Sequence, residues 1–311
     1  MKIAFMGTPA YAVPTLDALI GAGHNIVTVI AQPDRPSGRG KKLQSPPVAM
    51  RAKELGLDLR QPKAIRSGRF FENFRNLDLD LAIVVAYGRI LPTGLLEAPR
   101  RGCWNAHGSL LPRWRGAAPI ERAVQTGDQE TGVTLMQMDE GLDTGAMLLS
   151  KQAEIGPNER AIDLRERLSH LSAELILEAL EQIERLQPTP QPLSGILHAE
   201  PMRKAESWLD FSQPAARLHN QIRAFYPWPG SQTMFRGEQF KIHRAKVVEG
   251  EGTPGEIILA KKRLVVACAE GALEILEAQL PGKRALEAQA ILNGARIQAG
   301  EIMGVVPGEN P

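Results

Sequence analysis

The sequence predicts an α/β fold in which a doubly wound, mostly parallel sheet is followed by a smaller β-barrel domain. Three observations support this prediction. Strand-like and helix-like segments alternate up to residue 186, a proline-rich stretch follows, and short strand-like runs separated by glycines occupy the rest. Alternation of the two patterns is typical of parallel sheets. Several short strands with frequent turns are typical of a barrel, and an OB-like barrel is one option.

The first part contains six strand-like and three helix-like segments. The strand-like segments are continuously apolar or rich in β-branched residues, and they cover residues 2–7, 25–33, 79–88, 102–106, 132–139 and 145–155. The helix-like segments have helical apolar spacing or an early proline, and they cover residues 12–24, 46–56 and 158–186. The run at 79–88 is almost entirely apolar, as expected of a central strand covered on both faces.

The second part begins after the stretch QPTPQPLSG at residues 187–195, which holds three prolines. This composition is typical of an extended linker. We therefore predict a first domain over 1–186, a linker over 187–205 and a second domain over 206–311. In the second domain a helix is expected over 207–225, before strands at 231–235, 239–248, 255–260, 263–269 and 272–280.

The composition is that of an ordinary globular protein. The 311 residues include 37 basic and 35 acidic side chains, so no strong overall charge points to a polyanionic partner. Cys103 and Cys268 lie far apart in the sequence and fit neither a disulfide framework nor a zinc ribbon. No segment has the pattern of a signal peptide or approaches the ~20 apolar residues of a membrane span. We expect a cytoplasmic protein that does not associate with a membrane.

Polar side chains are found where predicted strands end. Asn105 and His107 close one strand, and Asp143 lies in a loop between two later strands. Ligands of doubly wound sheets bind outside the carboxyl ends of the strands. An amide can donate to a developing oxyanion, an imidazole can move a proton, and a carboxylate can fix the imidazole tautomer. Each residue alone also fits a capping or turn role, so attack on a carbonyl is predicted only from their joint placement.

Other kinds of site find little support. The first strand leads into GTPAYAVP, which has one glycine where a dinucleotide site has three, and no P-loop pattern occurs. The six histidines are scattered without metal-ligand spacing, so no metal is expected. Ser109 is a hydroxyl near the predicted site, but it lacks the G-x-S-x-G pattern of a nucleophile elbow.

A basic segment from Asp34 to Ser45 is a candidate for binding nucleic acid. Its charged side chains sum to +3, from Asp34, Arg35, Arg39, Lys41 and Lys42. Its glycines and prolines exclude a helix or a central strand, so we expect an exposed, mobile loop. Such a loop either contacts phosphates or simply solvates the surface.

Two stretches of the second domain allow more than one interpretation. RAFYPWPGS at 223–231 contains three aromatic residues and two prolines, and it fits a packed hinge or interdomain corner better than a base-stacking platform. The basic runs at 240–246 and 261–263 form either a nucleic-acid face or ordinary solvated faces. Residues 206–311 hold 12 basic and 12 acidic side chains, so only clustering would make such a face.

Five segments together resemble the methionyl-tRNA formyltransferase family: NAHGSLLPRWRGAAPI, MQMDEGLDTG, VVAYGRILP, QPDRPSGRGKKL and IRAFYPWPGS. The resemblance covers nearly the whole chain, whereas SLLP alone indicates only the broader formyltetrahydrofolate-using superfamily. It implies a Rossmann-like formyltransferase domain and an OB-like domain that helps to hold tRNA. It also implies transfer of the formyl group of 10-formyltetrahydrofolate to the amine of methionine on initiator tRNA.

The resemblance also assigns roles to individual residues. It implies a catalytic trio of Asn105, His107 and Asp143. It implies a folate-binding signature at Ser109, Leu110, Leu111 and Pro112. It places Arg39, with the neighbouring Lys41 and Lys42, in a loop that contacts the tRNA acceptor stem. Arg113 and Arg115 face either tRNA phosphates or nearby acids. We expect the protein to act as a monomer.

Two other classes of function share some of these features. A formyltransferase for amino sugars, or a hydrolase that passes the formyl group to water, would use the same trio but would need neither the basic loop nor the second domain. A non-catalytic RNA-binding module would use the loop and the barrel but would give the trio no role.

Overall fold

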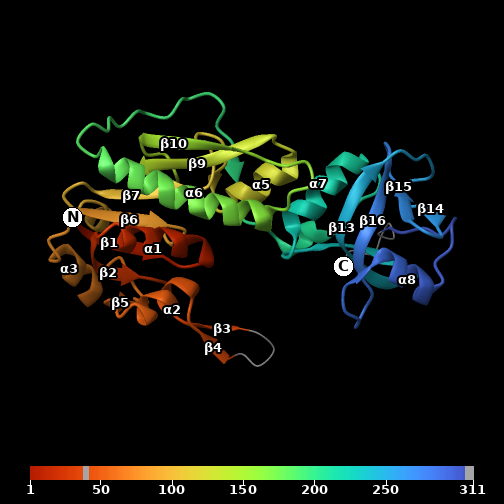
Figure 1. Cartoon of the computed structure of the whole chain (residues 1–311), viewed down its shortest axis with the longest axis horizontal. Helices are drawn as coiled ribbons and strands as arrows, with labels where there is room; N and C mark the ends of the chain where they lie inside the picture. Colours follow the sequence, from red (N-terminus) through yellow and green to blue (C-terminus); the bar gives the residue numbers. More distant parts are fainter. Residues whose placement is uncertain (38–41, 305–311) are drawn as a thin grey trace. The chain divides into compact units, whose positions relative to one another are not determined.

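The structure is a computed structural model that describes residues 1–37 and 42–304. The chain divides into two compact units (Figure 1). Unit 1 comprises residues 1–119, 130–154 and 165–200, and unit 2 comprises the remainder. The two short segments 120–129 and 155–164 therefore belong to unit 2, although they lie within the first half of the sequence.

Unit 1 is built on a seven-stranded sheet in the order β10-β9-β7-β6-β1-β2-β5. Its strands are β1 (Lys2–Gly7), β2 (Asn25–Ile30), β5 (Leu59–Arg60), β6 (Leu81–Val85), β7 (Cys103–His107), β9 (Glu130–Gln137) and β10 (Met147–Glu154). Neighbouring strands from β7 to β5 are parallel, whereas β9 is antiparallel to β7 and to β10. The predicted mostly parallel sheet is confirmed, with two antiparallel pairings, β7–β9 and β9–β10, at one edge.

The sheet is covered on both faces. Every residue of β6 is buried, as predicted for a central strand. On one face Met6 and Val84 pack in a cluster with Phe74 and Leu95 from flanking helices. On the other face Phe5 is fully buried, and Figure 1 shows α1 and α6 lying across this sheet. Burial on both faces explains why these strands lack the polar–apolar alternation of half-exposed strands.

The helices of unit 1 are short except for α6. They are η1 (Ala10–Ala12), α1 (Val13–Gly21), α2 (Pro47–Glu54), α3 (Arg69–Arg75), α4 (Thr93–Leu96) and α6 (Ala161–Glu181), whose first turn lies in unit 2. The helices predicted at 12–24, 46–56 and 158–186 are present with shorter bounds. α3 and α4 were not predicted, because stretches of seven and four residues carry too little periodicity to recognise.

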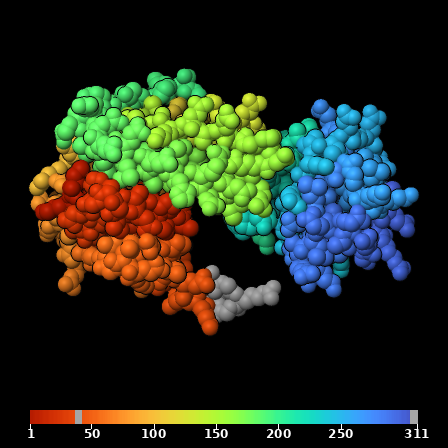
Figure 2. Space-filling model, viewed as in Figure 1, coloured from red at the N-terminus to blue at the C-terminus, as the bar shows by residue number. Residues whose placement is uncertain are grey.

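The basic segment forms a hairpin where the sequence predicted a loop. β3 (Arg35–Ser37) pairs antiparallel with β4 (Lys42–Gln44) outside the main sheet. An isolated ribbon of this kind tolerates Pro36 because a proline fits an edge strand, where no second neighbour needs its missing N–H. Figure 2 shows the hairpin protruding from the rest of unit 1. Arg39 and Lys41 lie outside the described residues.

Unit 2 contains an antiparallel sheet in the order β12-β13-β16-β15-β14, with β17 also paired to β16. Its strands are β12 (Ser231–Phe235), β13 (Glu238–Val248), β14 (Ile257–Ala260), β15 (Leu264–Ala267), β16 (Ala272–Gln279) and β17 (Leu286–Glu287). The segment Ile302–Met303 connects the two edges, because Met303 pairs with Phe235 of β12 and Ile302 with Glu256 beside β14. The sheet thus closes on itself, in agreement with the predicted barrel.

The helices of unit 2 are α5 (Pro119–Thr126), η2 (Lys204–Ser207), α7 (Ala215–Phe225) and α8 (Ala288–Ala295). The predicted helix over 207–225 is wrong in its first half. Leu209 N donates to Gln232 O at 2.8 Å, which holds this stretch extended against β12. Pro214 is also extended, and α7 begins only after it. The apolar residues before Pro214 pair with a strand and pack in the core. Their spacing in the sequence resembles that of a helix.

The proline-rich stretch is extended and bound along unit 1. Thr189 and Met147 exchange two backbone hydrogen bonds of 2.8 Å. Further on, β11 (His198–Ala199) pairs in parallel with β8 (Arg115–Gly116). This part of the chain therefore supports the residues that follow β7. Across residues 1–37 and 42–304, no helix has the length and apolar character to cross a bilayer.

Candidate active site

β7 brings two of the predicted site residues to one face of the sheet. Asn105 and His107 are two residues apart in β7, so their side chains point to the same side. Asn105 lies opposite Val84 of β6 and is half-buried. Within the described part of the chain, its side-chain amide has no hydrogen-bond partner. This amide is therefore available as a donor to a substrate atom.

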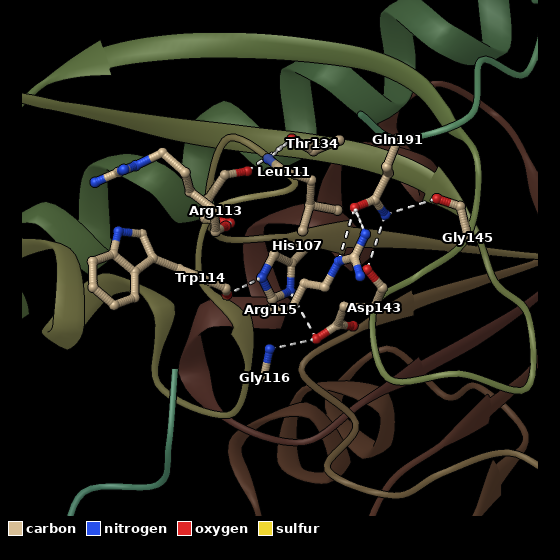
Figure 3. Close-up of polar contacts among 11 residues, drawn as sticks. His107, Leu111, Arg113, Trp114, Arg115, Gly116, Thr134, Asp143, Gly145 and Gln191 are labelled. Atoms are coloured by element: carbon tan, nitrogen blue, oxygen red, sulfur yellow. Dashed lines mark hydrogen bonds and ion pairs between the residues drawn. The ribbon is translucent and has the colours of Figure 1, made fainter. Parts of the chain in front are cut away.

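The His107 ring is held between two acceptors (Figure 3). Its Nε2 lies 2.8 Å from the backbone oxygen of Trp114, and its Nδ1 lies 3.5 Å from Oδ2 of Asp143. A carbonyl oxygen can only accept, so Nε2 carries a hydrogen. Nδ1 then faces a carboxylate oxygen. The histidine side chain is only 6% exposed, so this contact is largely shielded from solvent.

Asp143 reaches His107 from the loop between β9 and β10. Its backbone is left-handed, with φ of 54°, a conformation that aspartate tolerates better than most residues. Its Oδ2 accepts a hydrogen bond of 2.8 Å from Gly116 N. The predicted approach of His107 and Asp143 is therefore present, and a backbone N–H directs the carboxylate.

Gln191 clamps this loop and was not predicted as a site residue. Its Nε2 donates to the backbone oxygens of Asp143 at 2.9 Å and Gly145 at 2.8 Å. Its Oε1 accepts two hydrogen bonds from Arg115, of 3.0 and 2.8 Å. The side chain is buried, although it belongs to the proline-rich stretch. Composition alone gave no signal, because a glutamine in a polar segment is normally solvated.

Arg115 thus has a structural partner other than the acids or phosphates considered from the sequence. Its guanidinium bonds to the Gln191 amide, and its backbone belongs to β8. Arg113 is exposed, and its guanidinium carbon lies 5.7 Å from the centre of the Trp114 ring. The two arginines therefore differ: Arg115 supports the loop that carries Asp143, whereas Arg113 remains at the surface.

The predicted folate signature forms a tight turn after β7. Thr134 of β9 fixes it, because Thr134 Oγ1 donates to Ser109 O at 2.8 Å and accepts from Leu111 N at 3.0 Å. Ser109 is fully buried and its hydroxyl donates to Arg113 O at 2.6 Å. Leu111 is buried, while Leu110 and Pro112 are half-buried. The turn therefore sets the position of the Trp114 carbonyl that holds His107.

A second polar network lies at the carboxyl ends of β1, β2 and β6. Thr8 Oγ1 donates to Tyr87 O at 2.9 Å. The side-chain amide of Gln32 donates to Tyr87 O at 3.1 Å and to Gly88 O at 2.9 Å. These bonds fix the chain after β6, where Gly88 has a φ of 78°. The rim on which Asn105 lies is therefore ordered by hydrogen bonds on its β6 side.

A separate cavity of about 660 Å³ lies around the amino end of β7. Trp104, Gln137 and Leu148 line it, whereas Asn105, His107 and Asp143 do not. Acidic and basic side chains, among them Arg100 and Glu140, also line the cavity. The polar contacts around His107, rather than this cavity, define the candidate active site.

Catalysis by a cysteine nucleophile and catalysis by a bound metal ion find no support among the described residues. Burial raises the pKa of the Cys103 thiol to about 12, so it stays protonated at neutral pH and is a poor nucleophile. Among residues 1–37 and 42–304, no group of three or more histidine, cysteine, aspartate and glutamate side chains is arranged to bind a metal ion.

Comparison with known proteins identifies the relatives of this chain. Residues 1–180 match the formyl transferase family and residues 201–296 match the formyl transferase C-terminal domain. Among solved structures, an N-formyltransferase from Helicobacter canadensis has a TM-score of 0.69 at 17% identity, over 88% of this chain and 98% of that one. Methionyl-tRNA formyltransferase from Clostridium thermocellum has a TM-score of 0.57 at 15% identity, over 81% and 95%. These structures show the fold.

Sequence relatives are much closer. Methionyl-tRNA formyltransferase of Cereibacter sphaeroides is 48% identical over 302 residues, which cover 97% of this chain and 99% of the relative. The protein with the same name from Acidiphilium cryptum is 48% identical over 98% of this chain and all of its own length. Identity at this level over the full length, together with both domain matches, shows that the chain belongs to the methionyl-tRNA formyltransferase family.

Proposed function

We propose that this protein transfers the formyl group of 10-formyltetrahydrofolate to the α-amine of methionine on initiator tRNA. The observation that carries the proposal is the His107–Asp143 pair beside the unpartnered amide of Asn105. Unit 1 supplies all three residues, so one chain suffices for this site. A cytoplasmic monomer is part of the proposal. The proposal keeps residues 1–186 as the catalytic domain, 187–205 as the linker and 206–311 as the tRNA-binding domain.

The reaction needs charge stabilisation and one proton transfer. The neutral amine attacks the formyl carbon, a C–N bond forms, and the carbonyl electrons move to oxygen. The Asn105 amide donates to this oxyanion. When the oxyanion collapses, the carbon–N10 bond breaks, N10 of the folate gains a proton and the amine loses one. The net transfer passes through Asp143, directly or through water.

The geometry refines the role of His107. Both of its ring nitrogens face protein acceptors, so the ring would have to leave Trp114 O or Asp143 before it donated to the oxyanion. Without such a movement the ring acts through its contact with Asp143, which accepts the proton of the amine.

For the folate co-substrate we propose contacts with the turn Ser109–Pro112. The Ser109 hydroxyl already donates to Arg113 O. The half-buried Leu110 and Pro112 are therefore better placed to shape the binding surface than the serine is to bond with a ligand.

Formyl transfer itself is the direct test. We expect the purified protein to formylate methionyl initiator tRNA with 10-formyltetrahydrofolate and to use methionyl elongator tRNA poorly. Amino sugars and water serve as competing acceptors in the same assay. Transfer to either of these, without transfer to the initiator tRNA, would replace the proposal with one of the alternative formyl-folate activities.

The basic hairpin is proposed to contact tRNA phosphates through Arg39, Lys41 and Lys42. Lys42 is exposed at the start of β4. Replacement of each by alanine is expected to weaken tRNA binding and to reduce the slope of log K against log salt by about one per lost phosphate contact. Folate binding should be unchanged. Arg75→Ala, which removes an exposed charge from α3, is the matched control.

Gln191→Ala tests the support of the Asp143 loop. The substitution leaves two backbone oxygens and the Arg115 guanidinium without their partner, at a cost of about 1–3 kcal/mol in stability. We expect a fall in kcat smaller than that of an Asp143 variant, with KM for tRNA nearly unchanged. Leu193→Ala, in the same stretch but 93% exposed, is the control. Equal effects of the two substitutions would exclude a clamping role for Gln191.

A further inference from the structure

The side chain of Gln32 joins the basic hairpin to the rim of the main sheet. Gln32 is half-buried and lies between the end of β2 and the start of β3. Its Oε1 accepts a hydrogen bond of 2.6 Å from Nη2 of Arg35, the first residue of β3. Its Nε2 donates to Tyr87 O at 3.1 Å and to Gly88 O at 2.9 Å. An amide has an acceptor oxygen and a donor NH₂ group, so each end of this side chain binds a different segment.

The turn that receives these bonds has an uncommon backbone conformation. Ala86 and Gly88 are both left-handed, with φ of 47° and 78°. A left-handed alanine is uncommon and persists where the surrounding structure holds it. The carbonyl of Tyr87, between these two residues, accepts hydrogen bonds from Gln32 and from Thr8 Oγ1. These donors therefore hold residues 86–88, which we call the rim turn, in its conformation.

The rim turn continues the strand that lies beside Asn105. β6 leads directly into it, and Val84 of β6 pairs with Asn105 of β7. A displacement of about 1 Å at a reacting group can cost about 100-fold in rate. The conformation of the rim turn therefore bears on the position of the proposed oxyanion donor.

The base of the hairpin is fixed on both of its arms. Asp34 precedes β3 and accepts a hydrogen bond of 2.7 Å from Gln61 Nε2, which also donates to Gln32 O at 2.9 Å. Ser45 follows β4 and accepts from Lys53 Nζ at 3.1 Å. Hydrogen bonds from Gln61 and Ser45 lower the pKa of the Asp34 carboxyl, which is therefore ionised at neutral pH. Gln32 is thus part of the hydrogen-bonded base that carries the hairpin.

We propose that Gln32 is a positioning residue that couples the binding of tRNA by the hairpin to the conformation of the rim turn beside Asn105. RNA bound to the hairpin restricts its arms, and Arg35 then holds Oε1 of Gln32 in place. The amide in turn keeps both carbonyls of the rim turn where the reaction needs them. The inference rests on the proposed function, because it takes the ligand of the hairpin to be tRNA.

Two acceptors distinguish coupling from simple support of the turn. Methionyl initiator tRNA engages the hairpin, whereas methionyl-adenosine carries the same reacting amine without an acceptor stem. The loss relative to the wild type is measured as kcat for tRNA and as kcat/KM for methionyl-adenosine, both at saturating 10-formyltetrahydrofolate. KM for tRNA is measured separately, so that a loss of binding is not counted as a loss of coupling.

Two variants each break one end of the link. Gln32→Glu keeps an acceptor for Arg35 but removes the donor to the rim turn, whereas Arg35→Ala removes the bond to the hairpin. We expect each to lower the tRNA reaction about 3- to 30-fold more than the methionyl-adenosine reaction. The double variant should lose no more than Gln32→Glu alone, because both substitutions break the same link.

Thr8→Val is the matched control. It removes the other side-chain donor to Tyr87 O but leaves the bond between Gln32 and Arg35 intact. We expect it to lower both reactions by the same factor. Urea unfolding is measured for every variant. Arg35 is exposed, so its alanine variant should fold and tests the coupling even where Gln32→Glu is destabilised.

The outcomes separate this inference from the proposed function. If Gln32→Glu and Arg35→Ala lower both reactions equally, or if their losses add in the double variant, Gln32 does not couple the hairpin to the rim turn. The proposed function then stands as long as the wild-type protein formylates tRNA. If the wild-type protein does not formylate tRNA, the proposed function is wrong and the coupling is rejected with it.

Discussion

Asn105→Ala is expected to lower kcat about 100- to 1,000-fold, because it removes the donor assigned to the oxyanion. The amide is unpartnered among the described residues, so its loss leaves no buried group unsatisfied and should cost little stability. Asp143→Asn is expected to lower kcat about 100- to 10,000-fold through loss of the proton acceptor. Asparagine suits the left-handed backbone at this position and can still accept from Gly116 N, so the loop should keep its shape.

The measurement is single-turnover formyl transfer at saturating tRNA and folate. Affinity for tRNA and the thermal unfolding temperature are measured in parallel to show that each variant is folded and binds substrate. Near-normal turnover in both variants would refute the assignment of Asn105 and Asp143 to the reaction. A loss of tRNA affinity instead of turnover would give Asn105 a binding role.

Gly145→Ala is expected to disable the site without changing any polar group. A Cβ at this position would lie 1.7 Å from the backbone oxygen of Gln137, so the loop that carries Asp143 must move. Overpacking against backbone typically costs about 1–3 kcal/mol, and a displacement of about 1 Å at a catalytic group can cost about 100-fold in rate. We expect both a lower free energy of unfolding and a fall in kcat of this size.

Gly294→Ala is the matched control for this substitution. Gly294 lies in α8, and a Cβ there would have no atom within 4 Å. Alanine should therefore leave activity unchanged and stabilise the protein by up to about 1 kcal/mol. The free energy of unfolding in urea and kcat are measured for both variants. A Gly145→Ala protein with the activity of the Gly294→Ala protein would show that the loop does not position Asp143.

The alternation of strands and helices could be predicted from the sequence because central strands such as β6 are apolar at every position. The position of Asn105 and His107 at a sheet rim followed from the same pattern, since both lie at the end of a predicted strand. The residue at which α7 begins could not be predicted from the sequence. The apolar residues before Pro214 pack and pair with β12, and a pairing partner distant in sequence leaves no mark in local periodicity.

The same distinction separates the residues of the site. The sequence by itself determined the chemistry: an amide, an imidazole and a carboxylate on strand-end segments, within a chain that resembles one family throughout. Only the tertiary structure decided what holds those groups. The carbonyl of Trp114 fixes the His107 ring, and Gln191 bonds to the Asp143 loop 48 residues away in sequence. Every residue type has a backbone oxygen, and the Gln191 contacts join positions far apart in the sequence. Neither interaction therefore leaves a recognisable pattern in the local sequence.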